Sequence, residues 1–217
     1  MREQKPSSCS SSGNVLSCRE APRSPTGGRL LCWHAERVRA ASEEELNILR
    51  LLLSIDFDGV DALRIQAAAL RDVEPNCTCG CPSISPHLDR TSLPPARLTS
   101  RFPVEIIEMR RADGVPRTVL CFLDQYGYLG NLECTYYDGA LPQWPDPQDC
   151  AVLLNDQERH LEAVLLPSGA LVRPHQPSDR WRSVEMHEDL SFCATTWSGY
   201  RECYAPDGTQ LTRVFTK

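Results

Sequence analysis

Hydrophobic residues first recur at a regular spacing near residue 46. Leucines between Leu46 and Leu53 lie three or four residues apart, the spacing of one helix face. Ser42 followed by Glu45 is typical of a capping box, in which each residue caps the other at the start of a helix. The pattern therefore predicts a helix that begins after Ser42, and a second helix over residues 60–70.

The hydrophobic period changes to two after Pro103, which is typical of strands that present alternate side chains to two faces. Asp113-Gly114 and Tyr126-Gly127 are turn signals between the strand-like runs. We predict three strands that form an antiparallel meander, at residues 103–111, 118–123 and 128–137. The two helices are expected to pack on one face of this meander.

The chain after residue 150 is again strand-like, with short apolar runs separated by glycine-containing turns such as Ser198-Gly199. The sequence therefore predicts an α+β fold, with two N-terminal helices packed on an antiparallel β-meander and a β-rich C-terminal extension. We expect a disordered or poorly ordered head at residues 1–41, an α+β domain at 42–150, and the extension at 151–217. The extension can continue the same sheet.

Charge is concentrated in the middle of the chain. Residues 42–150 hold seventeen acidic and nine basic side chains, a net charge of −8, whereas the whole chain carries −6. Such a segment repels phosphate backbones, so we expect no nucleic-acid partner, while its carboxylates suit a basic protein partner. Residues 1–13 lack the apolar core of a signal peptide, and no run reaches the roughly 18 apolar residues of a membrane helix.

The chain has eleven cysteines. Without a secretion signal, we expect a cytoplasmic protein, no membrane association, and free thiols. Several of these thiols are expected to be buried as small apolar side chains.

Three of the cysteines fall within five residues, at Cys77, Cys79 and Cys81. In an extended segment all three thiols would face one side, and thiolates are preferred ligands of zinc. A structural zinc would need a fourth ligand, for which His87 or Cys121 is available. The spacing departs from paired Cys-x2-Cys knuckles, and redox pairs use Cys-x-x-Cys. The favoured interpretation is therefore a tight turn from helix to sheet at Gly80-Cys81-Pro82 with one or two thiols buried. The zinc site of Cys77, Cys79, Cys81 and His87 is the alternative.

The sequence contains no P-loop, dinucleotide-binding, zinc-protease or serine-hydrolase motif, which favours a protein that is not an enzyme. His160 lies two residues from both Glu158 and Glu162, so the three side chains would share one face of a predicted strand. Such a cluster could serve acid-base chemistry, although a solvated strand face explains it better.

Residues 46–150 resemble small actinobacterial proteins of unknown function. The resemblance is carried by residues 52–59, residues 62–66, the Cys-Gly-Cys-Pro-Ser segment at 79–83, and residues 128–133. It implies that the two helices, the cysteine turn and the meander form one unit. It carries over no catalytic residue, and Cys77 stands outside the shared segment.

The favoured function from sequence is a non-enzymatic intracellular interaction or accessory protein with an acidic core domain. One alternative is a small structural zinc-binding module that uses the cysteine cluster. The other is an unrecognised hydrolase or transferase that uses His160 and its neighbouring carboxylates.

Overall fold

The computed structural model describes residues 38–97, 100–110, 117–136, 143–156, 158 and 160–216. The predicted head lies outside the described residues except for its last four positions. The Asp113-Gly114 turn, and the cysteines at positions 9, 18 and 32, also lie outside them.

The first helix, α1 (Glu43–Leu52), begins as the sequence predicts. Ser42 Oγ accepts a hydrogen bond from the Glu45 amide at 3.2 Å, and the Glu45 carboxylate accepts one from the Ser42 amide at 2.8 Å. This capping box satisfies two amides that have no partner within the helix. Arg39 also binds the Glu45 carboxylate. The second helix, α2 (Val60–Ala69), follows Gly59, whose φ of 87° ends the intervening turn.

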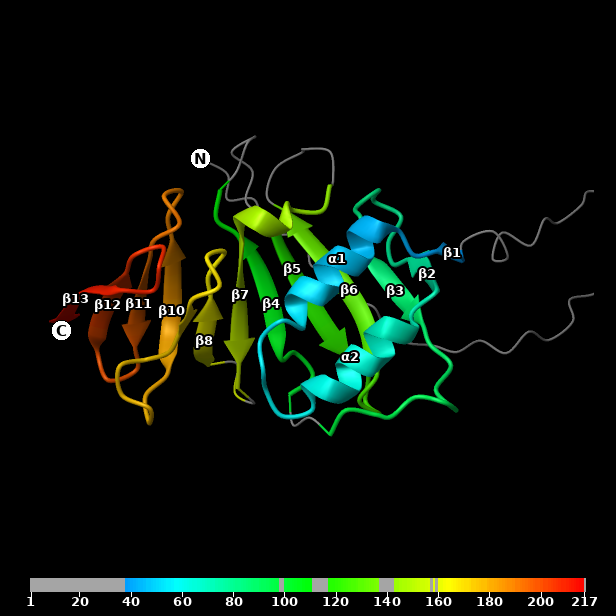
Figure 1. Ribbon diagram of the computed structural model, residues 1–217, viewed down its shortest axis with the longest axis horizontal. Coiled ribbons are helices and arrows are strands. Elements are labelled where there is room, and N and C mark those ends of the chain that lie inside the picture. The colour runs from blue at the N-terminus through cyan, green and yellow to red at the C-terminus, as the bar shows by residue number, and fades with distance from the viewer. Residues whose placement is uncertain are drawn as a thin grey trace, which may run out of the picture. The chain divides into compact units, whose positions relative to one another are not determined.

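In the described part of the chain, thirteen strands form one sheet in which every pair is antiparallel (Figure 1). The order across it is β1-β2-β3-β6-β5-β4-β7-β8-β10-β11-β12-β13, and β9 pairs with β8. The strands are β1 (Arg39–Ala40), β2 (Asp72–Pro75), β3 (Ile84–His87), β4 (Val104–Glu108), β5 (Arg117–Leu123), β6 (Leu129–Tyr136), β7 (Cys150–Asn155), β8 (Leu161–Leu165), β9 (Leu171–Val172), β10 (Trp181–Met186), β11 (Phe192–Thr196), β12 (Tyr200–Tyr204) and β13 (Gln210–Phe215).

The predicted α+β class is therefore wrong, because the chain is β-rich. Among the described residues, helices make up 14%, including the short 3-10 helix η1 (Pro147–Asp149), against 40% in strands. One physical source of the error is the segment around the cysteines, which was expected to be a turn from helix to sheet but is flanked by the paired strands β2 and β3. The C-terminal strands continue the same sheet through the pairing of β4 with β7.

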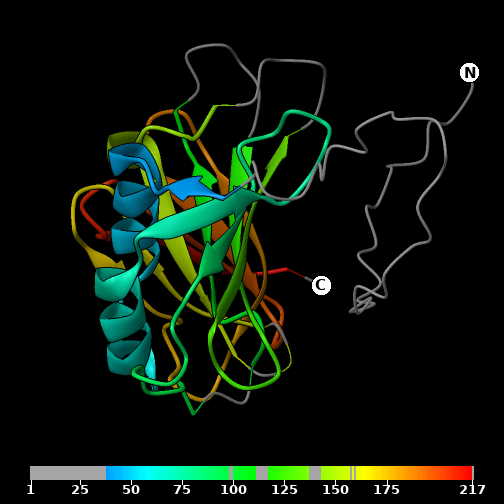
Figure 2. The same cartoon turned by 90° about the vertical axis from the view of Figure 1, so that its right-hand side faces the viewer.

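Two hydrophobic cores meet at β7, whose residues are all buried. Val152 and Leu154 belong to the core beneath the two helices, which also contains Leu52 from α1. Figure 2 shows both helices on the same side of the sheet. Ala151 and Leu153 belong to the second core, around Trp181 and other aromatic residues of β10 to β12. Since side chains alternate along a strand, β7 contributes to one core from each face.

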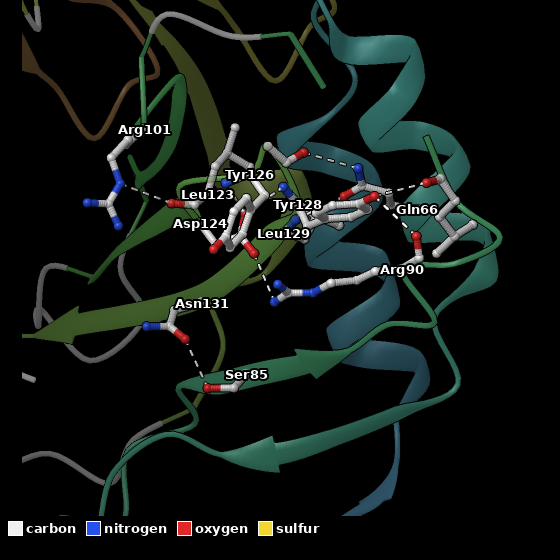
Figure 3. Close-up of polar contacts among 12 residues, drawn as sticks. Gln66, Ser85, Arg90, Arg101, Leu123, Asp124, Tyr126, Tyr128, Leu129 and Asn131 are labelled. Carbon is white, nitrogen blue, oxygen red and sulfur yellow. Dashed lines mark hydrogen bonds and ion pairs between the residues drawn. The ribbon is translucent and has the colours of Figure 1, made fainter. Parts of the chain in front are cut away.

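A buried amide ties α2 to the turn between β5 and β6 (Figure 3). The Gln66 side chain is fully buried, and its Nε2 donates to the carbonyl oxygens of Pro94 at 2.8 Å and Gly127 at 3.2 Å. Its Oε1 accepts a hydrogen bond from the Leu129 amide at 2.9 Å. Both ends of the amide are thus satisfied, as burial of a polar side chain requires.

The turn that Gln66 holds is itself closed by Asp124. Its Oδ1 accepts from the amides of Tyr126 at 2.8 Å and Tyr128 at 3.0 Å, and Arg90 approaches its Oδ2 at 2.8 Å (Figure 3). Gly127 has a φ of 86°, and a Cβ at this position would overlap the backbone of residue 96. The turn therefore requires glycine for both conformation and space.

Candidate metal centre

The cysteine cluster lies in the loop that joins β2 to β3. These strands pair Asp72 with His87 and Pro75 with Ile84, and the Asn76 amide donates to the Ser83 carbonyl oxygen at 2.9 Å. The loop at 77–82 is therefore the end of a hairpin, and the predicted turn from helix to sheet is wrong at this point.

Gly80, at the middle of this loop, has a φ of 87°. A Cβ there would have no atom within 4 Å. The position therefore needs glycine for its backbone conformation, and not for lack of space.

The hairpin loop brings three sulfur atoms together. The Sγ atoms of Cys77, Cys79 and Cys81 all lie within 4.8 Å of one another. Cys77 and Cys79 are joined by a disulfide, and the Cys81 Sγ lies 3.2 Å from the Cys77 Sγ. Cys79 is exposed, while the other two are half-buried. Within the described part of the chain, no other group of three or more His, Cys, Asp or Glu side chains is gathered in this way.

A buried serine connects the cluster to the rest of the sheet. The Ser83 side chain lies 3.2 Å from the Cys81 Sγ, which donates to its Oγ, and the same Oγ accepts from the Cys134 amide at 2.9 Å. Ser83 is followed by Ile84, which pairs with Leu132 of β6. The base of the loop is therefore fixed to β6, which limits the movement of Cys81.

His87, the predicted fourth ligand, is not brought to the sulfur atoms. It pairs with Asp72 at the opposite end of the hairpin, three residue positions beyond Ile84. That separation corresponds to roughly 10 Å along a strand. Its Nε2 instead lies 3.5 Å from the Glu74 carboxylate. Among the residues that the structure describes, the gathered donor set consists of the three sulfurs.

The other predicted ligand, Cys121, is also outside the group. It is fully buried on β5, and burial raises the pKa of its thiol to about 12. Cys134 on β6 is nearly as buried, and its pKa is raised to about 12 first by burial and then by the charge of Cys81. Since metals bind the thiolate, a thiol that resists ionisation in this way is a poor ligand.

A second disulfide joins Cys193 of β11 to Cys203 of β12, contrary to the expected free thiols. The two residues are directly opposite each other, with their Cα atoms 4.0 Å apart. The sequence holds a signal for this pair, because both are five residues from Ser198 in the predicted hairpin turn. Residues equidistant from a hairpin turn face each other across its strands.

His160, the candidate acid-base residue, immediately precedes β8. Its Nδ1 lies 3.5 Å from the Asp156 carboxylate and 3.6 Å from the Glu158 carboxylate. Asp156 also accepts hydrogen bonds from the amides of both Glu158 and His160, so it shapes the local turn. Glu162 lies 2.7 Å from Arg180. These carboxylates therefore serve turn and ion-pair contacts, and the predicted arrangement of the three side chains along one strand is wrong.

The chain matches no protein-family model, no curated protein and no solved structure. The resemblance to small actinobacterial proteins therefore stays a prediction. Among the described residues, no helix has the length and apolar character needed to cross a membrane.

Proposed function

We propose that the protein is a small metal-binding accessory module whose β2–β3 loop holds a thiophilic divalent ion such as zinc. The observation that carries this proposal is the gathering of three cysteine sulfurs within 4.8 Å of one another. Tetrahedral zinc with zinc–sulfur bonds of about 2.3 Å separates its sulfur ligands by roughly 3.8 Å. Small side-chain movements thus suffice to convert the cluster into a site, once its sulfurs are thiolates.

The proposed ligands are Cys77, Cys79 and Cys81, because the hairpin places His87 at its other end. Three protein ligands leave the fourth zinc position to water or to a ligand from another molecule. Ser83 Oγ accepts from the Cys134 amide, and its own hydroxyl can donate to Cys81 once that residue is a thiolate, so Ser83 holds one edge of the site in place. This anchoring favours binding, since less chain has to be ordered when the ion enters.

Such a site needs a reducing compartment, because its three cysteines must be thiolates. We therefore propose that the protein acts in the cytoplasm, as the sequence favours. The Cys193–Cys203 disulfide weighs against this location, because such bonds persist mainly in oxidising compartments. The redox state of this pair in protein taken from its native cell, with thiols trapped at lysis, decides between the two. A reduced pair supports the cytoplasm, whereas an oxidised pair contradicts it.

Zinc content tests the metal proposal. We expect reduced protein, purified without added metal, to hold about one zinc per chain. Cys81→Ser removes one ligand, so this variant should lose most of that zinc. Cys121→Ala is the matched control, because it removes a buried thiol outside the group. Equal zinc in the wild type and Cys81→Ser, or none in either, contradicts the proposal.

A role in binding a basic protein is the second candidate, and it is compatible with a metal module. Exposed carboxylates lie at the start of α1 and around the start of α2, where the side chains of Glu43, Asp56 and Asp61 are 73%, 88% and 90% exposed. Each of them also pairs with an arginine, Arg50 or Arg64, for which a basic partner would have to compete. Charge complementarity with this surface favours a basic partner. If these carboxylates drive binding, raising the salt concentration should weaken it steeply. Binding that is insensitive to salt contradicts this candidate.

A further inference from the structure

The three sulfurs of the loop combine a disulfide with a neighbouring thiol. Cys77 and Cys79 are bonded to each other, and the Cys81 Sγ lies 3.2 Å from the Cys77 sulfur. Metals bind cysteine as the thiolate, so a sulfur in a disulfide is not available as a ligand. In this covalent state the loop therefore offers a single thiol, whereas two added electrons would give it three.

We propose that this loop is a redox-gated metal site, an inference that rests on the metal-binding function proposed above. With all three cysteines reduced, it holds a thiophilic divalent ion. A two-electron oxidant of the peroxide class then joins Cys77 to Cys79 and expels the ion.

The reaction balances in atoms and electrons. One sulfur–sulfur bond forms between Cys77 and Cys79, and the bonds of both sulfurs to the metal break. The two thiolates give up two electrons, which cleave the oxygen–oxygen bond of the peroxide. With two protons from solvent this yields two waters, while the metal ion leaves unchanged in charge and Cys81 remains a thiolate.

The position of the three residues favours such a reversible step. Cys79 is exposed, so an oxidant or a small reducing thiol can reach its sulfur. The bond closes a loop between residues only two apart, and bridging so short a segment restricts the unfolded chain little. Breaking the bond therefore removes little stability from the fold.

Cys81 allows the disulfide to move to another pair of cysteines without restoring the metal site. Its sulfur is close enough to attack the Cys77 sulfur and release the Cys79 thiolate, which exchanges one disulfide for another. Either disulfide leaves one free sulfur in the loop. Loss of the metal is thus expected whichever pair is joined.

The test uses the full chain with Cys193→Ser and Cys203→Ser, which removes the other disulfide as a competing target for the oxidant. The protein is reduced, loaded with zinc ion, and treated with an equimolar amount of hydrogen peroxide. Free zinc is followed with a chromogenic chelator, and a peptide mass map records the state of the remaining cysteines. We expect zinc release in step with formation of a disulfide within the Cys77–Cys81 loop, and rebinding after a dithiol is added.

The outcomes separate the two proposals. If the reduced chain binds no zinc, both the metal-binding function and the gating are wrong. If it binds zinc and retains it after the disulfide forms, the gating alone is wrong. Another outcome is zinc release that accompanies oxidation of a cysteine to sulfinic acid, with no disulfide formed and no reversal by a dithiol. That result also overturns the gating. The chain with Cys193 and Cys203 intact should release zinc in the same way, but after more peroxide.

Discussion

Replacing Gln66 by methionine should destabilise the protein strongly, although the two side chains have similar size and flexibility. Gln66 is fully buried and makes three hydrogen bonds that join α2 to the chain around the β5–β6 turn. Methionine can fill the same space but can replace none of these bonds. The substitution therefore isolates the polar contribution from packing.

The size of the effect depends on which of the three partner groups keep another hydrogen bond after Gln66 is replaced. The Gly127 carbonyl oxygen still accepts from the Ala96 amide at 2.9 Å. The buried Leu129 amide loses the Gln66 acceptor, and a buried donor without a partner costs about 1–3 kcal/mol. The Pro94 carbonyl oxygen also loses its donor, but Pro94 is exposed and water can replace the bond, so we expect a total loss of about 2 kcal/mol in the free energy of unfolding.

Urea unfolding measures this loss. With a slope of about 2 kcal/mol per molar urea, the midpoint should fall by about 1 M. Gln176→Met is the matched control, because Gln176 is exposed and its replacement should change stability by less than about 0.5 kcal/mol. A midpoint for Gln66→Met that equals the control's would refute the assigned role of the amide.

Two further predictions concern the fold. Gly127→Ala should cost at least about 3 kcal/mol, because the new Cβ overlaps the backbone of residue 96. Gly169→Ala, at the same φ of 86° but with open space, should cost only about 1 kcal/mol of backbone strain. Equal urea midpoints for the two would contradict the steric argument. The raised pKa values of Cys121 and Cys134, about 12 against an ordinary 9.0, mean that folding keeps both thiols neutral. The contribution of these neutral buried thiols to the free energy of unfolding is complete below pH 9 and is lost as the pH rises from 9 to about 12. The loss is about 1.4 kcal/mol per pH unit for each thiol in that range. Urea midpoints from pH 8 to 10 should fall accordingly, and less steeply in Cys121→Ala; parallel slopes would count against this assignment.

Local patterns predicted the elements whose signals lie within a few residues. The capping box of Ser42 and Glu45 is confirmed, and the alternation after Pro103 correctly places β4, β5 and β6 next to one another. The strands β2 and β3 have four residues each and contain Pro75 and Pro86. Proline weakens a strand signal because it cannot donate to the ladder, so these strands were missed and the fold class was wrong.

Pairings between distant segments were beyond the sequence pattern. β3 pairs with β6 and β4 pairs with β7, although other strands intervene in the chain. Hydrophobic alternation states which face of a strand is buried but does not identify its neighbour. The first pairing joins the predicted meander to the β2–β3 hairpin, and the second joins it to the C-terminal strands.

The candidate site was predictable only where it depends on residues that are close together in the sequence. Cysteines at alternate positions 77, 79 and 81 predicted sulfurs on one side of an extended segment. The structure gathers the three sulfurs in a hairpin loop instead, with Gly80 in the left-handed region. The position of His87 depends on the register of β2 with β3, which the sequence did not reveal. The pairing of Cys193 with Cys203 could have been found from their equal distance to the Ser198 turn.

X-ray absorption at the zinc edge, on the reduced and zinc-loaded full chain, tests the proposed metal site most directly. We predict three sulfur neighbours at about 2.3 Å and one lighter atom at about 2.0–2.2 Å. The sulfur shell should shrink in Cys81→Ser and stay intact in Cys121→Ala. A zinc ion surrounded only by nitrogen and oxygen, or a spectrum that Cys81→Ser leaves unchanged, would contradict the assignment of the hairpin loop as a metal centre.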